Sequence, residues 1–314
     1  MKQRTRGSGI RIKIVGIGGG GSNAVERMLE TNIPMVDYVT INTDDGGFHA
    51  SHAQTKVQIG QRETKGRGAG ADPDKGRRSA FENRREIEKV LQDCDMLFIA
   101  AGMGGGTGTG AAPVVAEVAR ELGLLTVAIV TTPFAFEGKR RMGNALAGIA
   151  RLKEFVDAIV TIPNDNLKLA TKANVTLNNA FIVADNVLVE TVKNLVELIQ
   201  NTASINCDFA DICSVLHASG DLYTATGIAS GMSRTTDIVE QIKTSVLQGK
   251  SIAGCNSVLL YFTASGDVLL DEIQEIAEAV QAEADPDANI IMGMNFNENM
   301  NDEIKVVLFA TQKK

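Results

Sequence analysis

The sequence predicts an α/β protein with a parallel-sheet first domain, a long central helix and a smaller second α/β domain. Over the first two-thirds of the chain, apolar runs rich in β-branched residues alternate with helical patterns, as in a parallel sheet covered on both faces. From about residue 180 this alternation gives way to one long helical pattern. The length of 314 residues suits about two domains of ~150 residues each.

Each strand of the first domain is expected from an apolar run that polar residues, glycines or Pro163 bring to an end. The strands expected are residues 10–17, 36–42, 96–101, 124–132 and 158–162. The helices between them follow from apolar residues at helical spacing. They are residues 23–30, 74–93, 112–123 and 138–156.

The remaining third begins with a long helix at 181–201 that has no strand directly after it. Further helices are expected at 240–248 and 269–284, and strands at 256–264, 288–295 and 304–311. The pattern predicts a disordered N-terminal segment (1–9), a first domain (10–178), a connecting helix (179–202) and a second domain (203–314).

The composition, with 44% apolar and 22% charged residues, is that of an ordinary globular protein. A net charge of −7 gives no support for a nucleic-acid partner. The four cysteines have no C-x-x-C spacing and His49 and His52 have no further ligand nearby, so no metal-ligating side chain is assigned. The sequence contains no run of ~18 apolar residues and no signal-peptide core. We therefore expect a cytoplasmic protein without direct membrane insertion.

Two glycine-rich stretches follow predicted strands. Residues 16–21 satisfy G-x-G-x-x-G, with Asp44 after the next strand, which is the dinucleotide-binding pattern. The stretch AGMGGGTGTG (101–110) holds six glycines, and Thr107 and Thr109 would add hydroxyl donors. Two glycine turns at helix starts, on one edge of a sheet, would present main-chain N–H groups to a row of phosphates. The loop 68–74 could add further amides.

The lysine-containing phosphate loop G-x-x-x-x-G-K-[ST] is absent from the sequence, which disfavours an ordinary switch GTPase. Backbone amides must then take the place of the lysine, and this explains the density of glycine. A flexible linker is the alternative for 101–110, but a strand leads directly into the stretch and a helix directly out of it.

Together these stretches resemble the tubulin/FtsZ superfamily, and within it the bacterial cell-division branch. The resemblance runs over about residues 10–311. Besides GIGGGGSN and GGGTGTG it rests on NTD (42–44), GAGADP (68–73), TPFAFEGKRRM (132–142), IPNDNL (162–167), ADNVL (184–188) and NCDFAD (206–211). The family fold has a nucleotide-binding parallel-sheet domain, a long central helix and a smaller α/β second domain, which agrees with the pattern above.

The resemblance implies hydrolysis of GTP to GDP and phosphate, with Mg²⁺ bridging the phosphates. It implies that Asn23 and Asp185 read the guanine edge, with Phe181 stacked on the base, and that Glu137 and Arg141 grip the ribose and nearby phosphates. Adenine would be rejected, because each contact left unmade costs about 1–3 kcal/mol. The nucleotide-contacting positions implied are Gly19, Gly20, Gly21, Asn23, Asn42, Asp44, Ala69, Gly70, Ala71, Gly102, Gly104, Gly105, Gly106, Thr107, Gly108, Thr109, Gly110, Thr131, Pro133, Glu137, Arg141, Asn164, Phe181 and Asp185.

Several of these residues also have a plain structural interpretation. Phe181 on a long helix would ordinarily be core, although Asp185 on the same helical face favours a ligand role. Glu137 and Arg141 are four residues apart, so a solvated ion pair is the default interpretation.

The catalytic residues that the resemblance implies are Asp208 and Asp211, with Asn206 beside them. In the family this segment enters the nucleotide pocket of the next subunit, where the aspartates orient the attacking water. Alternatively, Asp208 is a helix N-cap and Asp211 a first-turn acid. If the family role holds, a monomer binds GTP but barely hydrolyses it. Head-to-tail contact does not close and therefore builds a filament, a homopolymer of the chain itself. The resemblance also implies a division ring at midcell, with division-ring regulators as partners.

The sequence departs from the family at Ser22, often a glycine, and at Gly143-Asn144, which interrupts a helix. The family usually continues past the last strand into a disordered linker and anchor peptide, which this sequence does not print. Two rival functions remain. A dinucleotide-dependent oxidoreductase would leave 101–110 and 206–211 unexplained, whereas a non-hydrolysing GTP-binding regulator of the same fold would not.

Overall fold

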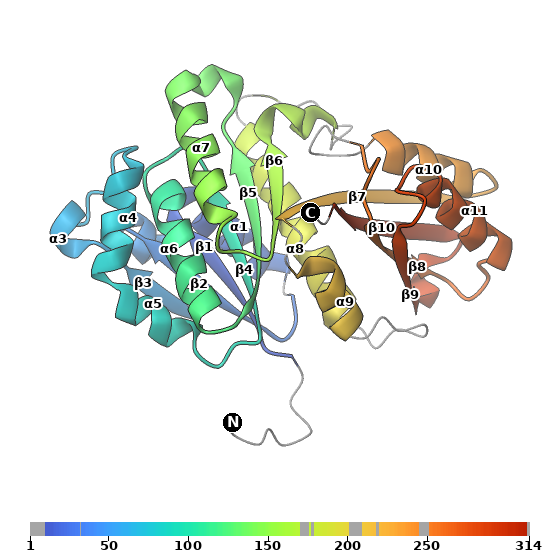
Figure 1. Ribbon diagram of the computed structural model, residues 1–314, viewed down its shortest axis with the longest axis horizontal. Coiled ribbons are helices and arrows are strands. Elements are labelled where there is room, and N and C mark those ends of the chain that lie inside the picture. The colour runs from blue at the N-terminus through green and yellow to red at the C-terminus, as the bar shows by residue number, and fades with distance from the viewer. Residues whose placement is uncertain are drawn as a thin grey trace. The chain divides into compact units, whose positions relative to one another are not determined.

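The computed structural model describes residues 10–31, 33–169, 176, 179–200, 209–217, 220–244 and 251–312. The chain divides into two compact units, residues 1–156 and 157–314. Each unit is built on strands of its own (Figure 1).

The first unit is a parallel α/β sheet with strand order β3-β2-β1-β4-β5. Its strands are β1 (Ile12–Ile17), β2 (Val36–Asn42), β3 (Thr55–Gln58), β4 (Met96–Gly102) and β5 (Leu125–Thr132). Its helices are α1 (Gly18–Thr31), α2 (Asp45–Ala50), α3 (Gln61–Thr64), α4 (Pro73–Glu82), α5 (Arg84–Leu91), α6 (Thr107–Glu121), α7 (Lys139–Leu152) and the 3₁₀ turn η1 (Ala135–Glu137). In Figure 1 helices α5, α6 and α7 lie in front of these strands.

The strands of this sheet are apolar because both of their faces are covered. In β4 every residue from Met96 to Ala101 is buried, and Phe98 is fully enclosed. Near-continuous burial of this kind is the mark of a parallel sheet with helices on both sides. Because β1, β2, β4 and β5 are all parallel, their carboxyl ends meet at one edge, with Ile17 paired to both Ile41 and Ala101.

The second unit mixes parallel and antiparallel pairs in the order β6-β7-β10-β8-β9. Its strands are β6 (Ala158–Pro163), β7 (Gly220–Ser230), β8 (Ser257–Ala264), β9 (Asn289–Phe296) and β10 (Glu303–Thr311). Its helices are α8 (Ala180–Gln200), α9 (Phe209–Leu216), α10 (Arg234–Thr244) and α11 (Leu270–Gln281), with 3₁₀ turns η2 (Asn164–Leu169) and η3 (Glu298–Met300).

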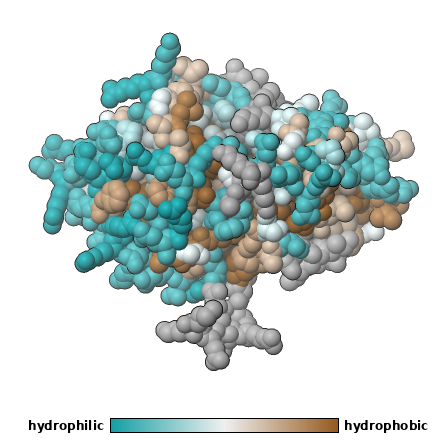
Figure 2. All heavy atoms as spheres, in the orientation of Figure 1, coloured by the Kyte–Doolittle hydropathy of each residue, from teal (hydrophilic) through white to brown (hydrophobic). Residues whose placement is uncertain are grey.

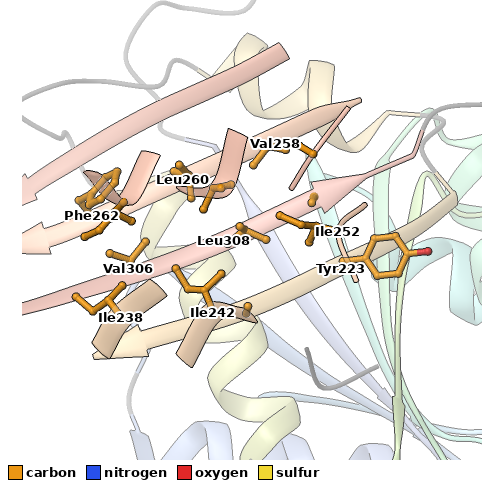
Figure 3. Packing of buried hydrophobic residues seen from close by; sticks show 14 of the residues in the cluster. Tyr223, Ile238, Ile242, Ile252, Val258, Leu260, Phe262, Val306 and Leu308 are labelled. Atoms are coloured by element: carbon orange, nitrogen blue, oxygen red, sulfur yellow. The ribbon is translucent and has the colours of Figure 1, made fainter. Parts of the chain in front are cut away.

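The core of this unit lies between its sheet and the helices α10 and α11. Alternate residues of β8 and β10 point into it, as a period of two requires. Figure 3 shows Ile238 and Ile242 of α10 directed toward Val306 and Leu308 of β10. On the opposite face Lys305 reaches α8, where its Nζ donates to Asn194 Oδ1 at 2.9 Å.

An ion pair ties α10 to α11. The guanidinium of Arg234 donates to both carboxylate oxygens of Glu272, each at 2.6 Å, and the two side chains are 10% and 18% exposed. The Arg234 hydrogen bond lowers the pKa of Glu272 below its ordinary value, against the opposing effect of burial. A bidentate pair of this kind fixes the angle at which the two helices pack.

The two units differ in charge. Residues 1–156 carry 22 Lys and Arg against 17 Asp and Glu, a net charge of +5. Residues 157–314 carry 9 against 21, a net charge of −12. Between 251 and 304 the sequence has 11 acidic residues and no Lys or Arg. Figure 2 shows that hydrophilic residues predominate over α3 and α4 on the face in view.

Most expected elements are present, and the differences concern glycine and short strands. Helix α1 begins at Gly18 rather than at 23, and α6 at Thr107 rather than at 112. The single helix expected at 74–93 is two helices that meet at Asn83. Strands β3 and β7 were not expected. Among the described residues, no helix is long and apolar enough to cross a membrane.

Candidate nucleotide-binding site

The site lies at the carboxyl ends of β1, β2, β4 and β5, where two glycine-rich helix starts meet. A Cβ at Gly18 would lie 2.9 Å from the backbone nitrogen of Gly108, so the first turns of α1 and α6 touch through main chain. Gly18 also has a φ of +71°, a conformation that glycine adopts without strain. The expected convergence of the two glycine stretches is therefore present.

Glycine is required where α1 crosses the end of β4. A Cβ at Gly21 would lie 2.2 Å from the carbonyl oxygen of Ala100, and one at Gly20 would lie 3.4 Å from Gly102. This proximity is why the glycines expected as a loop form the first turn of a helix instead. Gly19 and Gly20 remain exposed, so their N–H groups face outward.

Neither helix start is capped by a side chain. The residue before α6 is Gly106, which has no side chain, and Ile17 before α1 is apolar. The first N–H groups of a helix have no partner within it, and each helix start carries about +0.5 of a charge. Two such starts side by side repel each other unless an anion lies between them. The arrangement suits a chain of phosphates.

The stretch after β4 is braced internally. The N–H of Gly104 donates to Thr109 Oγ1 at 2.7 Å, and Thr109 is buried. The N–H of Met103 donates to the carbonyl of Thr131 at 2.9 Å. Thr109 and Thr131 therefore hold the turn in shape, while the half-buried Gly102, Gly105 and Thr107 form its accessible side.

A third loop, residues 68–72, lies against the start of α6. A Cβ at Gly106 would lie 2.6 Å from Ala69 Cβ and 2.9 Å from the nitrogen of Asp72. Gly70 and Ala71 both have positive φ, of 63° and 58°. Ala71 is a non-glycine residue in this conformation, which is held here by its surroundings. The carbonyl of Ala71 accepts a hydrogen bond from Asn144 Nδ2 of α7 at 3.5 Å.

The acidic side chains near these loops act as helix caps. Asp72 accepts from the N–H groups of Asp74 and Lys75 at the start of α4. Asp44 Oδ2 accepts from Gly47 N at 2.7 Å at the start of α2. The neighbouring Asn42 accepts from the N–H groups of the two residues after it, at 2.9 and 3.3 Å.

The residues after β5 form a compact turn. Glu137 accepts from the N–H of Phe134 at 2.9 Å and also pairs with Arg141, one turn along α7. The ion pair considered for these two residues is therefore present, with Glu137 10% and Arg141 46% exposed. Gly104 packs on Pro133, because a Cβ there would lie 2.5 Å from the proline ring.

The remaining predicted positions belong to other parts of the chain. Asn23 is exposed on α1. Asn164, Phe181 and Asp185 belong to the second unit; Asn164 is 6% exposed and its Oδ1 is buried without a hydrogen-bond partner among the described residues. Phe181 is 50% exposed at the start of α8, with Asp185 one turn further on.

The predicted catalytic segment is described only in part. Asp211 lies in the first turn of α9. Asn206 and Asp208 lie outside the described residues.

Two residues of the first unit were missed from the sequence. Thr43 is fully buried and its Oγ1 lies 2.6 Å from Thr107 Oγ1. Gly76 of α4 packs on Gly106, because a Cβ there would lie 2.2 Å from the Gly106 carbonyl oxygen. The sequence gave one local signal for each, a polar NTD turn and a glycine inside a helix, and neither signal names its distant partner.

Comparison with known proteins agrees with this site. Residues 11–172 match the family described as "Tubulin/FtsZ family, GTPase domain", and residues 220–314 match "FtsZ family, C-terminal domain". The cell division protein FtsZ of Coxiella burnetii (strain RSA 493 / Nine Mile phase I) is 45% identical over 302 residues, which cover 96% of this chain and 78% of that protein.

Solved structures give the same result. The empty FtsZ dimer of M. jannaschii is 40% identical, with a TM-score of 0.89 over 97% of this chain and 88% of that one. The GTPγS-bound protofilament of CetZ2 from Haloferax volcanii is 17% identical with a TM-score of 0.83, over 97% of this chain and 95% of that one; it is a likeness of fold. The expected fold and GTPase domain are confirmed, and the chain belongs to the tubulin/FtsZ family of GTPases.

Proposed function

We propose that this GTPase, which self-associates as a cytoskeletal protein of cell division, hydrolyses GTP in a site that a second copy of the chain completes. The observation that carries the proposal is the pair of uncapped helix starts at Gly18 and Thr107. Their N–H groups would hold the phosphates without a lysine. The loop 68–72, which lies against Gly106, would extend this surface to the third phosphate.

Base and sugar recognition follow the family assignment. Asn23 and Asp185 would bind the guanine edge, Phe181 would stack on the base, and Asn164 would contact the nucleoside. The buried, unpartnered Asn164 Oδ1 supports this assignment, because a buried acceptor is costly until a donor reaches it. Glu137 and Arg141 would contact the ribose and nearby phosphates, exchanging part of their ion pair for the ligand.

Water activation would come from the neighbouring copy. In the first unit, Asp44 and Asp72 beside the phosphate loops already cap helices, so neither is available to orient water. Asp208 and Asp211, with Asn206, would supply that function from the segment that begins α9. Phosphoryl transfer depends on positioning and charge stabilisation, so half a site should be slow.

Mg²⁺ is part of this proposal. The described residues contain no group of three His, Cys, Asp or Glu side chains suited to a metal ion. Phosphate oxygens and water would therefore hold the ion, as Mg²⁺ commonly requires beside a nucleotide. When bound, it would neutralise charge on the phosphates.

Assembly follows from the same geometry. A segment of one copy that enters the pocket of the next makes a heterologous contact, which does not close and yields a filament. We place the filament in the midcell division ring, with division-ring regulators as further partners and without membrane insertion. The domain limits proposed from the sequence, with the connecting helix at 179–202, also belong to this proposal.

The test measures phosphate release from GTP with Mg²⁺ against protein concentration, with light scattering in the same cuvette. Release and scattering should rise from a common threshold. Asp211→Ala should still scatter but release phosphate ~10²-fold more slowly. Asp37→Ala, at an exposed position near the start of β2, is the matched control and should behave like the unsubstituted chain.

Release that stayed constant per molecule on dilution would refute completion by a second copy. Nucleotide binding without scattering or turnover at any concentration would indicate a GTP-binding partner protein instead. Binding of NAD without phosphate release would favour the oxidoreductase alternative.

A further inference from the structure

The inference concerns Thr43, a residue between two predicted nucleotide contacts that the family assignment leaves without a role. It follows the last residue of β2 and is completely buried. Its Oγ1 lies 2.6 Å from Oγ1 of Thr107, the first residue of α6, 64 positions further along the chain.

The neighbours of Thr43 hold its backbone in place. Its N–H donates to Asn42 Oδ1 at 2.9 Å. Its carbonyl accepts from Thr64 Oγ1 at 3.1 Å, and Thr64 is itself buried. Because both backbone groups are engaged, the hydroxyl of Thr43 is presented to α6 in one orientation.

The direction of the bond between the two hydroxyls follows from counting protons. Each hydroxyl has one proton and can also accept. In the part of the chain that the structure describes, Thr107 Oγ1 is the single hydrogen-bond partner of the Thr43 hydroxyl. If Thr107 donated, the proton of Thr43 would be buried without an acceptor, which is costly. Thr43 therefore donates to Thr107.

The proton of Thr107 is then left for another acceptor. Thr107 is half-buried and lies at the uncapped start of α6, beside N–H groups that also point outward. A phosphate only accepts hydrogen bonds, so a hydroxyl that turned its lone pairs outward would repel it. The donation from Thr43 gives Thr107 the polarity that an anion requires, and one hydrogen bond strengthens the next in such a chain.

We propose that Thr43 is a positioning residue, which makes the Thr107 hydroxyl a fixed donor to the phosphates. The inference deepens the proposed function and rests on it. Thr43 itself does not touch the nucleotide; it acts through Thr107.

The test uses the full chain below its assembly threshold and measures GDP and GTP binding by equilibrium dialysis at constant Mg²⁺. Thr43→Val, which keeps the shape and removes the hydroxyl, should weaken both nucleotides by about three- to tenfold. Thr43→Ser, which keeps the hydroxyl, should bind like the unsubstituted chain. In a Thr107→Val background, Thr43→Val should cause no further loss.

Thermal unfolding provides a second readout. Thr107→Val leaves the buried hydroxyl of Thr43 without its acceptor and should lower the melting temperature. The double variant removes both partners and should recover part of that loss. A purely structural role for Thr43 predicts the opposite order, with the double variant least stable.

The outcomes separate the two proposals. If the unsubstituted chain binds nucleotide and Thr43→Val binds equally well, or if its effect adds fully to that of Thr107→Val, the inference is wrong. If Thr43→Ser is as weak as Thr43→Val, the methyl group rather than the hydroxyl matters, and the inference is also wrong. If the unsubstituted chain binds neither GDP nor GTP, the proposed function fails, and the inference fails with it.

Discussion

Gly76→Ala should separate two helices that the structure brings into backbone contact. The new Cβ would lie 2.2 Å from the Gly106 carbonyl oxygen, whereas ordinary contact begins at 3.4 Å. The backbone of α4 or of α6 must therefore move by about 1.2 Å, the difference between these two distances. Overpacking of this size costs about 1–3 kcal/mol, of which the better helix propensity of alanine returns up to ~1 kcal/mol.

The displacement also reaches the phosphate loops. Gly106 supports the loop 68–72 through Ala69 and Asp72, so moving α4 shifts that loop relative to α6. A misplacement of about 1 Å in such a site costs on the order of 10²-fold in rate. We expect Gly76→Ala to weaken GTP more than GDP, because the loop 68–72 is assigned to the third phosphate.

The assay pairs this variant with Gly143→Ala. Gly143 also lies inside a helix, but a Cβ there would meet nothing within 4 Å. It should therefore stabilise the chain by up to ~1 kcal/mol and leave the ratio of GTP to GDP affinity unchanged. Thermal unfolding and equilibrium dialysis measure the two effects. If both variants change melting temperature in the same direction and leave the affinity ratio alone, the contact between α4 and α6 does not set the geometry of the loop.

Two further predictions concern buried ionisable groups. The Arg234 hydrogen bond lowers the pKa of Glu272, so this carboxylate adds stability above its unfolded pKa of ~4.3 and loses it as pH falls through the lower folded value. Glu272→Gln should therefore be about 1–3 kcal/mol less stable at pH 7, and urea unfolding should find a smaller difference near pH 3. Burial raises the pKa of Cys94 and of Cys255 to about 11. Iodoacetamide at pH 8 should spare both thiols in the native chain and label both in urea, as mass spectrometry of the peptides would report; labelling in the native chain would mean that these sites open.

The periodic strands and helices could be predicted from the sequence because each carries its own signal. Strand β4 is apolar throughout and was expected within one residue of its limits. Strand β7 was missed because its 11 residues, GDLYTATGIAS, mix glycine and polar residues with only short apolar alternation. Helices α1 and α6 begin earlier than expected because glycine has low helix propensity. Tertiary packing overrides that propensity here, where Gly21 must approach Ala100.

The site was predictable where a motif presents main chain, and less so where a side chain acts on a distant one. Glycine spacing alone indicated that two helix starts converge on one edge of the sheet. Asp44 could be placed near the site, but its use as a cap for α2 depends on local backbone geometry. The pairing of Thr43 with Thr107 joins positions that no local pattern relates, so only the fold reveals it.

The opposite net charges of the two units, +5 and −12, make each copy of the chain electrically polar. In a head-to-tail contact the acidic unit of one copy approaches the basic unit of the next. Contacts between like units bring like charges together. Self-association is thereby biased toward elongation over lateral bundling, and the bias is strongest when salt is low, since charges more than about 8 Å apart are screened at physiological ionic strength. Added salt or divalent cations should shift the balance toward bundles, which makes the thickness of an assembly a readout of the charge that its sequence segregates.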